Sequence, residues 1–374
     1  MKVVYFGHNS GDAAVRRRVV SLERAGCSVT GFMPHREGAA PPAWENEDLG
    51  ETRDNDYGHR VRSIFSGARV VSDHAERMAG ADLMIARNLD MLALACRARR
   101  RLGATVPLIY ECLDVHHKLT GTGMASKALR ALEARLLRNC ALVVVSSPGF
   151  EREYFAKHHE GRYKAFLAEN RLIEGDAFPP RPGQAPPRSG PLRIGWFGNL
   201  RCSVSLDLLL GIAERFRNEA EIVLRGYPAP GVFPDFEGLL AGHANVTYHG
   251  RYKAPQDLEA IYADVDVVWA GDWYETGANS LWLLPNRIYE GGYFGTPALA
   301  PSGTETARWL ADKDAGFLID EPVGEALTTR VAALISDRGP IAAKRAALLA
   351  LPRDVFVEGP GSVREMIAAA GVPL

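Results

Sequence analysis

Residues 193–224 read RIGWFGNLRCSVSLDLLLGIAERFRNEAEIVL and are the clearest indication of the fold class. The apolar run 193–197 predicts a strand, and residues 206–216 repeat apolar side chains at the spacing of an amphipathic helix. A second apolar run, 221–224, predicts the next strand. A strand, a glycine-containing turn, a helix and another strand, in this order, are typical of a parallel sheet with crossover helices.

The same alternation runs through most of the chain. In the first half, a strand predicted at 2–6 ends in a polar turn, and the following helix has Val15, Val19 and Leu22 on one face. Further strands are predicted at 28–32, 83–86, 108–111, 141–146, 246–248, 265–270 and 297–300. Residues 35–60 are polar and are expected to form a long loop. The pattern predicts an α/β protein with two doubly wound, Rossmann-like domains.

A proline-rich segment separates the two halves. Residues 176–191 contain six of the 23 prolines, a density that neither helices nor sheets tolerate. We therefore expect an N-terminal domain over 1–175, a linker over 176–191 and a C-terminal domain over 192–354. The final helix, about 355–374, is expected to pack back on the first domain.

The composition is that of an ordinary globular protein. Of the 374 residues, 47% are hydrophobic and 24% are charged, which excludes collagen, a disordered chain and a disulfide-stapled miniprotein. No apolar run approaches the roughly 20 residues of a membrane-spanning helix, and no signal peptide is recognised. The five cysteines include no CxxC pair, so free thiols in a reducing cytoplasm are expected.

Charge is unevenly distributed along the chain. The formal net charge is −1, but the first 150 residues are net basic and the remainder is net acidic. A basic first domain favours an anionic partner, such as a membrane surface or a phosphate-bearing substrate. A nucleic-acid partner is not expected.

Residues 279–297 read NSLWLLPNRIYEGGYFGTP. Pro285 suits the first turn of a helix and Gly295 suits its end. Arg287 and Glu290 are three residues apart and therefore share a helix face. A carboxylate there can accept both hydroxyls of a ribose, while Arg287 and the helix start suit a pyrophosphate. A surface ion pair beside a helix end explains these residues equally well.

This segment resembles the nucleotide-sugar segment of GT-B glycosyltransferases, particularly glycosyltransferase family 4 enzymes that build bacterial capsules and exopolysaccharides. The resemblance implies that Glu290 holds the donor ribose and that Asn279, Ser280 and Asn286 belong to the same donor site. The family often has a second glutamate eight residues before the first, where this chain has Trp282. The departure removes one contact that the family makes with the donor sugar.

Turns after three strands complete the predicted donor site. Gly198, Asn199 and Arg201 follow the first strand of the second domain, where backbone N–H groups can approach a phosphate and Arg201 adds positive charge. An ordinary tight turn is the alternative. The resemblance implies that Arg201 substitutes for an arginine that the family has at the position of Asn199. It also implies that Gly226 and Gly250 line the nucleobase pocket.

No metal site is predicted. Asp264 and Asp266 match the Asp-x-Asp pattern of metal-dependent glycosyltransferases, but they stand at the entry to a strand, so a turn is the better interpretation. No other spacing of metal ligands is convincing. No cofactor is expected, and the nucleoside-diphosphate sugar, expected to be UDP-linked, is the donor substrate.

Polar clusters follow three strands of the first domain, and we interpret them as an acceptor site. The predicted acceptor residues are His8, Asn9, Arg16, Arg87, Asn88, Asp90 and His116. If the reaction inverts the anomeric carbon, a base must deprotonate the acceptor hydroxyl, and Asp12, Glu111 and Asp114 are the candidates. Asp12 also suits a helix N-cap, which is the commoner role.

Residues 124–140 are predicted to form an amphipathic helix. Leu129, Leu132 and Leu136 are expected on one face, and the other face is expected to hold Lys127, Arg130, Arg135 and Arg138. Such a helix can attach a domain to an anionic bilayer, although solvated basic faces are also common. Acceptors of the resembling family are often lipid-linked, which favours a peripheral position on the inner face of the cell membrane.

These observations predict a GT-B enzyme whose two domains face each other across a cleft. It would move a hexose or uronic acid from a UDP-linked donor on the second domain to a saccharide acceptor on the first. Closure at a hinge over 171–192 would exclude water. The resemblance implies retention of anomeric configuration and no metal requirement.

Two other functions remain open. A GT-B nucleotide-sugar 2-epimerase would use the same donor site, and so would a non-catalytic nucleotide-sugar-binding partner in a polysaccharide assembly complex. A dehydrogenase is not expected, because no G-x-G-x-x-G motif follows the first strand of either domain.

Overall fold

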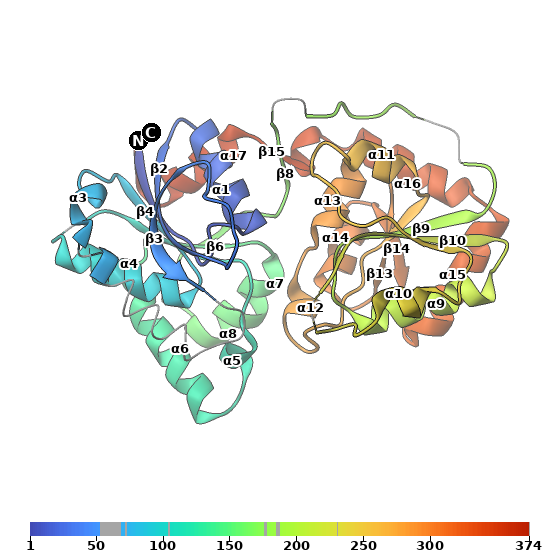
Figure 1. The fold of residues 1–374 in the computed structure, drawn as a ribbon, viewed down its shortest axis with the longest axis horizontal. Coiled ribbons are helices and arrows are strands. Elements are labelled where there is room, and N and C mark those ends of the chain that lie inside the picture. The colour runs from blue at the N-terminus through green and yellow to red at the C-terminus, as the bar shows by residue number, and fades with distance from the viewer. Residues whose placement is uncertain are drawn as a thin grey trace. The chain divides into compact units, whose positions relative to one another are not determined.

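The computed structural model describes residues 1–52, 69–71, 73–103, 105–175, 178–184, 188–229 and 231–373. They form two compact units. Unit 1 comprises Met1–Glu169 together with Gly359–Leu374, and unit 2 comprises Asn170–Glu358. In each unit, strands lie at the centre and helices lie outside them (Figure 1).

Unit 1 contains a seven-stranded parallel sheet within its described residues, with strand order β3-β2-β1-β4-β5-β6-β7. The strands are β1 Lys2–Phe6, β2 Ser28–His35, β3 Glu45–Glu51, β4 Leu83–Arg87, β5 Leu108–Cys112, β6 Leu142–Val145 and β7 Ala165–Leu167. The strands predicted near 2–6, 28–32, 83–86, 108–111 and 141–146 are therefore confirmed. Because the strands are parallel, their carboxyl ends meet at one edge of the sheet.

Crossover helices connect these strands. They are α1 Ala13–Arg24, α3 Ala75–Met78, α4 Leu89–Arg101, α5 His117–Thr120, α6 Met124–Leu137, α7 Pro148–Phe150, a π-helical turn Glu151–Phe155 and α8 Ala156–His159. Helix α1 begins at its N-cap Asp12, and Val15, Val19 and Leu22 are fully buried on its inner face, as predicted. The C-terminal helix α17, Pro360–Ala369, contributes Val363 to the same apolar core.

Strand β3 corrects the loop expected over 35–60. Its sequence, ENEDLGE, is acidic and has a single buried side chain, Leu49, so no alternating apolar pattern marks it. Among the described residues the strand lies at the edge of the sheet and pairs with β2, and charged side chains are usual at such an edge. Residues 53–60 of the expected loop lie outside the described residues.

Helix α6 is present, and the expected assignment of its faces is correct only in part. Leu136 is buried as expected, whereas Leu132 is 42% exposed and Leu129 is half-buried. The inner face instead contains fully buried Glu133, whose carboxylate accepts hydrogen bonds from Tyr110, Tyr154 and His159. A buried carboxylate with three partners satisfies its polar atoms inside the core, which hydrophobic periodicity does not anticipate.

Unit 2 contains a six-stranded parallel sheet within its described residues, with strand order β11-β10-β9-β12-β13-β14. The strands are β9 Leu192–Leu200, β10 Ala220–Pro228, β11 Val246–Tyr248, β12 Val267–Trp269, β13 Ala298–Pro301 and β14 Gly316–Ile319. A separate two-stranded sheet pairs β8 Leu172–Ile173 with β15 Val357–Glu358. All of the strands predicted in this half are present, but β9 and β10 continue beyond their predicted ends.

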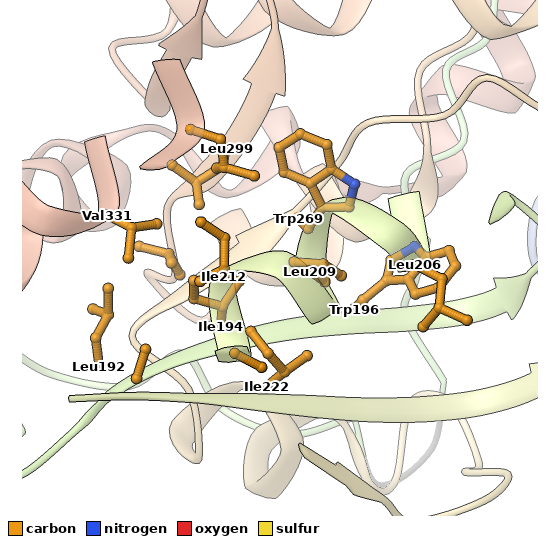
Figure 2. Close-up of a cluster of buried hydrophobic side chains, with 14 of the residues drawn as sticks. Leu192, Ile194, Trp196, Leu206, Leu209, Ile212, Ile222, Trp269, Leu299 and Val331 are labelled. Atoms are coloured by element: carbon orange, nitrogen blue, oxygen red, sulfur yellow. The ribbon is translucent and has the colours of Figure 1, made fainter. Parts of the chain in front are cut away.

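Helices cover both faces of this sheet, since the buried side chains of β9 alternate between two apolar clusters. Trp196 packs with Leu209 and Trp269 in one cluster (Figure 2), and Phe197 belongs to the other. The helices are α9 Ser203–Arg215, α10 Phe236–Leu240, α11 Leu258–Ala263, α12 Asn279–Trp282, α13 Asn286–Tyr293, α14 Glu305–Asp312, α15 Val323–Ser336 and α16 Gly339–Ala350, followed by a 3₁₀ turn at Arg353–Val355.

The described residues of the proline-rich segment form hydrogen bonds with α13 and α16 of unit 2. Arg181 donates to the backbone oxygens of Tyr293, Leu348 and Leu351, at the ends of α13 and α16. The Tyr293 hydroxyl in turn donates to the carbonyl of Pro179 over 3.0 Å. The division between the units accordingly falls at Glu169/Asn170, before the segment whose composition suggested a linker.

Two further sequence expectations can be compared with the structure. The five cysteines are free thiols, as predicted. In the described part of the chain, no helix combines the length and apolar character that crossing a membrane requires.

Candidate functional site

Three predicted glycines meet near the carboxyl edge of the unit 2 sheet. Gly198 and Gly226 are registered opposite each other in β9 and β10, and the Gly226 N–H donates to the Gly250 carbonyl over 2.7 Å. Both strand glycines have positive φ, and a Cβ on Gly226 would lie 1.7 Å from the Gly198 carbonyl oxygen. Only glycine fits this close approach. Gly198 and Asn199 therefore lie inside β9, not in the turn predicted after it.

Helix α13 carries the predicted ribose and pyrophosphate residues one turn apart. Glu290 is 6% exposed, and its Oε2 accepts a hydrogen bond from the Tyr262 hydroxyl over 2.8 Å. Burial and the neighbouring Glu290 carboxylate raise the pKa of Tyr262 well above its usual value, so this hydroxyl remains a donor. The arrangement fixes the Glu290 carboxylate. Asn286, the first residue of α13, is half-buried.

The Arg287 side chain extends towards the end of β12, where its Nη1 donates to the Trp269 carbonyl over 3.1 Å. Burial lowers the pKa of Arg287, and the Asp272 carboxylate opposes that shift. The guanidinium keeps its charge at neutral pH, because arginine is effectively always protonated. Arg287 is therefore a partly desolvated cation beside the sheet edge.

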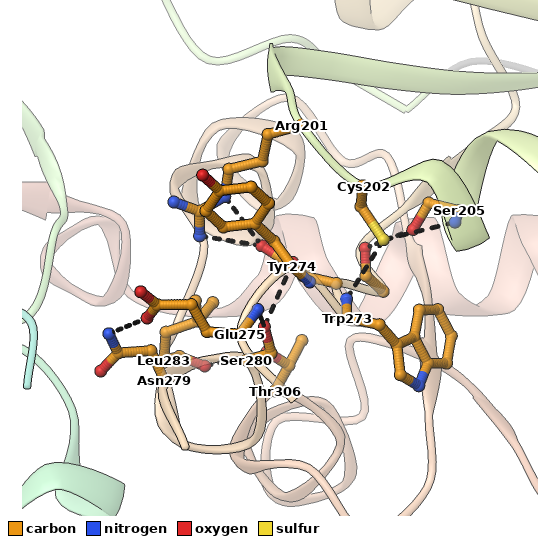
Figure 3. Close-up of polar contacts among 12 residues, drawn as sticks. Arg201, Cys202, Ser205, Trp273, Tyr274, Glu275, Asn279, Ser280, Leu283 and Thr306 are labelled. Carbon is orange, nitrogen blue, oxygen red and sulfur yellow. Dashed lines mark hydrogen bonds and ion pairs between the residues drawn. The ribbon is translucent and has the colours of Figure 1, made fainter. Parts of the chain in front are cut away.

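Arg201 lies just beyond β9, and Asp272 lies in the loop after β12. Arg201 donates to Asp272 Oδ2 through Nε over 3.2 Å and through Nη2 over 2.9 Å. The guanidinium also lies over the Tyr274 ring, 5.0 Å from its centre (Figure 3). Arg201, Asp272 and Arg287 thus form one group, in which two cations share an acidic neighbour.

Asn279 and Ser280 hold the loop that carries Asp272. The Ser280 hydroxyl donates to Asp272 Oδ1 over 3.2 Å and accepts from the Glu275 N–H over 2.9 Å. The Asn279 amide donates to the Glu275 carboxylate. Both side chains are buried, with exposed fractions of 3% and 5%, and their contact with a ligand stays a prediction.

Unit 1 brings the predicted acceptor clusters together at one sheet edge, because β1, β4 and β5 are neighbours. The outcome for Glu111 differs from the expectation. It is fully buried on β5, and its carboxylate accepts from Arg18, Arg87 and Tyr5. Arg18 and Arg87 are buried as well.

The electrostatics of this cluster make Glu111 a poor general base. Burial raises the pKa of Glu111, but Arg87 and then Arg18 outweigh that effect and lower the pKa to about 2. A buried carboxylate with so low a pKa neither reaches an acceptor hydroxyl nor takes its proton readily. Arg87, which is 2% exposed, is likewise a partner of this carboxylate instead of an acceptor contact.

Asp12 caps α1 by accepting the N–H groups of Ala14 and Val15 over 2.9 and 3.0 Å. Burial raises its pKa, but His8, the capped Val15 N–H and Arg87 together hold the pKa below its usual value. The commoner capping role is therefore the one the structure shows. Asp114, the third candidate base, is exposed.

The other acceptor residues lie on the loops after these strands or in the first turns of α1 and α4. His8 Nε2 is 3.8 Å from Asp12 Oδ2, Asn9 is 4% exposed, and exposed Arg16 donates to the Gly11 carbonyl over 3.2 Å. Asn88 precedes α4 with φ of 72°, an uncommon conformation for a residue with a side chain. The remaining two bond to the backbone at helix starts: Asp90, in the first turn of α4, accepts from the Met91 N–H, and His116 Nδ1 caps α5 by accepting from the Lys118 N–H.

Sequence reasoning missed Asp272, Tyr274, Glu275 and Tyr262. Asp272 directly follows a predicted strand and Gly271, the signal that identified the clusters of unit 1. Tyr262 carried no signal, because it reads as an apolar position of a short helix.

The two aspartates of the Asp-x-Asp pattern precede β12, as expected. Asp266 accepts from Arg193 and Arg338, and Asp264 pairs with Arg193. They lie at the amino end of β12, whereas Arg201 and Asp272 follow the carboxyl ends of β9 and β12. Within the described part of the chain, no group of three or more histidine, cysteine or acidic side chains is arranged to hold a metal ion.

Comparison with known proteins gives one curated relative over most of the chain. No family model matches the sequence. The succinoglycan biosynthesis protein ExoL of Rhizobium meliloti (strain 1021) is 37% identical over 337 residues, which cover 88% of this chain and 83% of ExoL.

Solved structures resemble the whole chain at low sequence identity. HepE of Anabaena, in complex with UDP and glucose, has a TM-score of 0.71 at 16% identity, with complete coverage of both chains. Sucrose-phosphate synthase of Thermosynechococcus elongatus has a TM-score of 0.71 at 14% identity, covering 99% of this chain and 100% of its own. WaaG, a glycosyltransferase involved in lipopolysaccharide biosynthesis, has a TM-score of 0.66 at 16% identity, covering 98% and 99%.

The likeness to these structures confirms the expected architecture of two Rossmann-like domains. The identity with ExoL is high enough, and its coverage broad enough, to show the family. The chain therefore belongs to the family of the succinoglycan biosynthesis protein ExoL and has the GT-B glycosyltransferase fold.

Proposed function

We propose that the chain transfers a hexose or uronic acid from a UDP-linked sugar to a saccharide acceptor in exopolysaccharide or capsule synthesis. Its relationship to ExoL supports the pathway class. HepE, which has the same fold, has been solved with UDP, with UDP-glucose and with UDP and glucose, which supports this donor class.

The assignment of the donor site rests on one observation. Arg201 and Arg287, which are 86 residues apart in sequence, lie in one group around Asp272 beside the carboxyl edge of the unit 2 sheet. Guanidinium groups are the side chains best suited to bind a diphosphate, through charge-assisted and bidentate hydrogen bonds. Glu290, one turn after Arg287, supplies the carboxylate that a ribose diol requires.

In the proposed reaction, the bond between the anomeric carbon and the diphosphate breaks, and negative charge develops on the leaving diphosphate. Arg201 and Arg287 stabilise that charge. We propose retention of configuration and metal independence on the resemblance to family 4. For an inverting reaction, Asp114 and Asp12 are the remaining bases, because Glu111 is held inside its ion cluster.

We further propose that unit 1 binds the acceptor, that this acceptor is lipid-linked, and that α6 contacts the inner face of the cell membrane. Met124 is 81% exposed and Leu132 is 42% exposed. Lys127, Arg135 and Arg138 are exposed on the same helix or at its end. An exposed surface of apolar and basic side chains suits an anionic bilayer. Arg130 does not belong to it, because its Nη1 donates to the carbonyls of Leu119 and Gly121.

Calorimetric titration with UDP, GDP and NAD, first without metal and then with magnesium, tests the donor assignment. UDP is expected to bind without metal. Glu290→Ala is expected to weaken UDP binding by about 1.5–3 kcal/mol, the value of a hydrogen bond to a charged group. UDP affinity that is unchanged in folded Glu290→Ala protein would contradict the ribose role. Preferential binding of NAD would contradict the proposed function as a whole.

A further inference from the structure

We propose that Asp272 is a positioning residue for sugar transfer, which orients Arg201 towards the leaving diphosphate without contacting the substrate itself. The proposal rests on the function proposed above. The sequence pattern alone assigns this residue no role.

The Asp272 carboxylate is fully engaged by the protein. Its Oδ2 accepts two hydrogen bonds from Arg201, and its Oδ1 accepts from the Tyr274 N–H over 2.7 Å and from the Ser280 hydroxyl over 3.2 Å. The side chain is 11% exposed. With four donors around two oxygens, this carboxylate has little capacity left for a sugar hydroxyl. The carboxylate therefore acts on Arg201 and not on the substrate.

Asp272 constrains both the edge and the face of the Arg201 guanidinium. It binds the edge that carries Nε and Nη2, and it fixes the backbone of Tyr274, whose ring lies against the guanidinium face. Figure 3 shows Arg201 and Tyr274 side by side above the loop. A guanidinium held at one edge and one face has few orientations left, so its remaining donors point in a defined direction.

The two segments that carry this pair are also joined directly. The sulfur of Cys202, next to Arg201, accepts from the N–H of Trp273, next to Asp272, over 3.2 Å. The same sulfur accepts from the Ser205 N–H in the first turn of α9 (Figure 3). The loop after β12 is thus tied to the start of α9, which keeps Arg201 and Asp272 in register.

The charge of Asp272 has opposite effects on binding and on reaction. A carboxylate beside Arg201 and Arg287 repels a bound diphosphate, and it competes for the Arg201 donors. The same carboxylate holds Arg201 where charge develops as the glycosidic bond breaks. Interactions that favour the transition state over the bound substrate raise kcat without tightening binding. Asp272 is therefore expected to affect kcat much more than donor affinity.

Asp272→Asn is the informative variant, because the amide oxygen can still accept from Tyr274 and Ser280 while the anionic partner of Arg201 is lost. We expect its UDP affinity, measured by calorimetry, to equal or exceed that of the wild type. We expect kcat for UDP release from UDP-glucose, with water as acceptor, to fall by roughly 10²-fold. Arg201→Ala is expected to weaken UDP binding by about 10- to 100-fold.

The orientation of the Arg201 guanidinium can be followed by NMR in the absence of substrate. The Nε–H resonance of Arg201, identified by its absence in Arg201→Lys, is expected to exchange slowly with water in the wild type and rapidly in Asp272→Asn. Glu221→Gln is the matched control, because Glu221 forms a half-buried pair with Arg193 near the other end of β9. This control is expected to change neither the Arg201 resonance nor UDP binding.

The outcomes separate this proposal from the proposed function. Wild-type protein that binds no UDP overturns the donor site itself. Wild-type protein that binds UDP, together with Asp272→Asn that weakens UDP binding as much as Arg201→Ala, overturns the positioning role alone. An unchanged Arg201 resonance in Asp272→Asn overturns it as well.

Discussion

Arg87 Nε donates to one oxygen of Glu111 over 2.9 Å, and Nη2 of the same guanidinium forms an ion pair with that oxygen at 2.8 Å. The other oxygen of Glu111 accepts from Arg18 Nε over 2.5 Å. All three side chains are buried, so the Glu111 carboxylate is compensated by two guanidinium groups, and Arg87 also lies 3.8 Å from Asp12. The cluster joins α1, β4 and β5, the elements whose loops carry the predicted acceptor residues.

Glu111→Gln is expected to lower the free energy of unfolding by about 3–5 kcal/mol, because it removes the carboxylate that the two buried arginines share. Urea unfolding followed by circular dichroism measures this loss. Glu153→Gln is the control, since Glu153 forms more exposed pairs with Arg152 and Lys157 and is expected to contribute less than about 1 kcal/mol. Equal losses in the two variants would contradict the buried network.

The same carboxylate predicts a pH dependence. Burial raises the pKa of Glu111, but Arg87 and Arg18 lower it to about 2, against an ordinary value of 4.5. A depressed pKa stabilises the folded state above the unfolded pKa, and this contribution is lost as pH falls towards the folded pKa. The stability difference between wild type and Glu111→Gln should therefore shrink by roughly 3 kcal/mol between about pH 5 and pH 2. A difference that stays constant with pH would refute this assignment.

The sequence predicted the buried strands and the turns at their carboxyl ends better than it predicted the roles of polar side chains. Apolar runs marked the buried strands, and the restart at residue 193 marked the second sheet. Strand β3 lacked such a run because it lies at an edge and buries Leu49 alone. Burial of Glu111 and Glu133 was not foreseeable either, since their partners come from segments distant in sequence, such as Arg18 and His159.

The candidate donor site shows the same limit. The spacing of Arg287 and Glu290 was sufficient to place them on one helix face, because helix geometry is local. Asp272 requires knowledge that the loop after β12 lies beside the end of β9, which depends on the strand order of the sheet. The pairing of charged groups that are distant in sequence therefore could not be predicted, even where each residue stood in a recognisable turn.

Tyr262→Phe tests how Glu290 is held. Removing the hydroxyl deletes the 2.8 Å hydrogen bond to Glu290 Oε2 and leaves the ring packing in place. UDP binding is expected to weaken by about 0.5–1.5 kcal/mol, less than in Glu290→Ala, because the carboxylate is retained but less fixed. Calorimetric titration of both variants decides the order. A larger loss in Tyr262→Phe than in Glu290→Ala would show that the tyrosine itself contacts the nucleotide.

Gly226→Ala tests the close approach of β9 and β10. The new methyl group would lie 1.7 Å from the Gly198 carbonyl oxygen, so the strands must separate where they border the candidate site. UDP binding is expected to be lost and the melting temperature to fall. Gly211→Ala is the control, because Gly211 lies in α9 with no other atom within 4 Å of an added Cβ. That substitution is expected to stabilise the protein by about 0.5–1 kcal/mol.

The exposed surface of α6 predicts binding to anionic membranes. The variant Lys127→Gln/Arg135→Gln/Arg138→Gln is expected to lose about 1 kcal/mol of membrane binding for each charge removed, and so roughly 100-fold in total at low salt. Co-sedimentation with vesicles of phosphatidylglycerol and phosphatidylcholine measures this change. Met124→Ser/Leu132→Ser is expected to weaken binding that persists at high salt, because it removes the apolar contact.

A general effect of charge has to be separated from an effect of α6. Neutralising Arg215, Arg217 and Lys253, which are exposed on unit 2, changes the net charge by the same amount. This control is expected to sediment with vesicles like the wild type, since attraction to the membrane falls off within a Debye length of the charges that face it. If both triple variants lose binding equally, the attraction is a property of net charge. If neither does, α6 is not the contact, and its exposed leucine and methionine require another explanation.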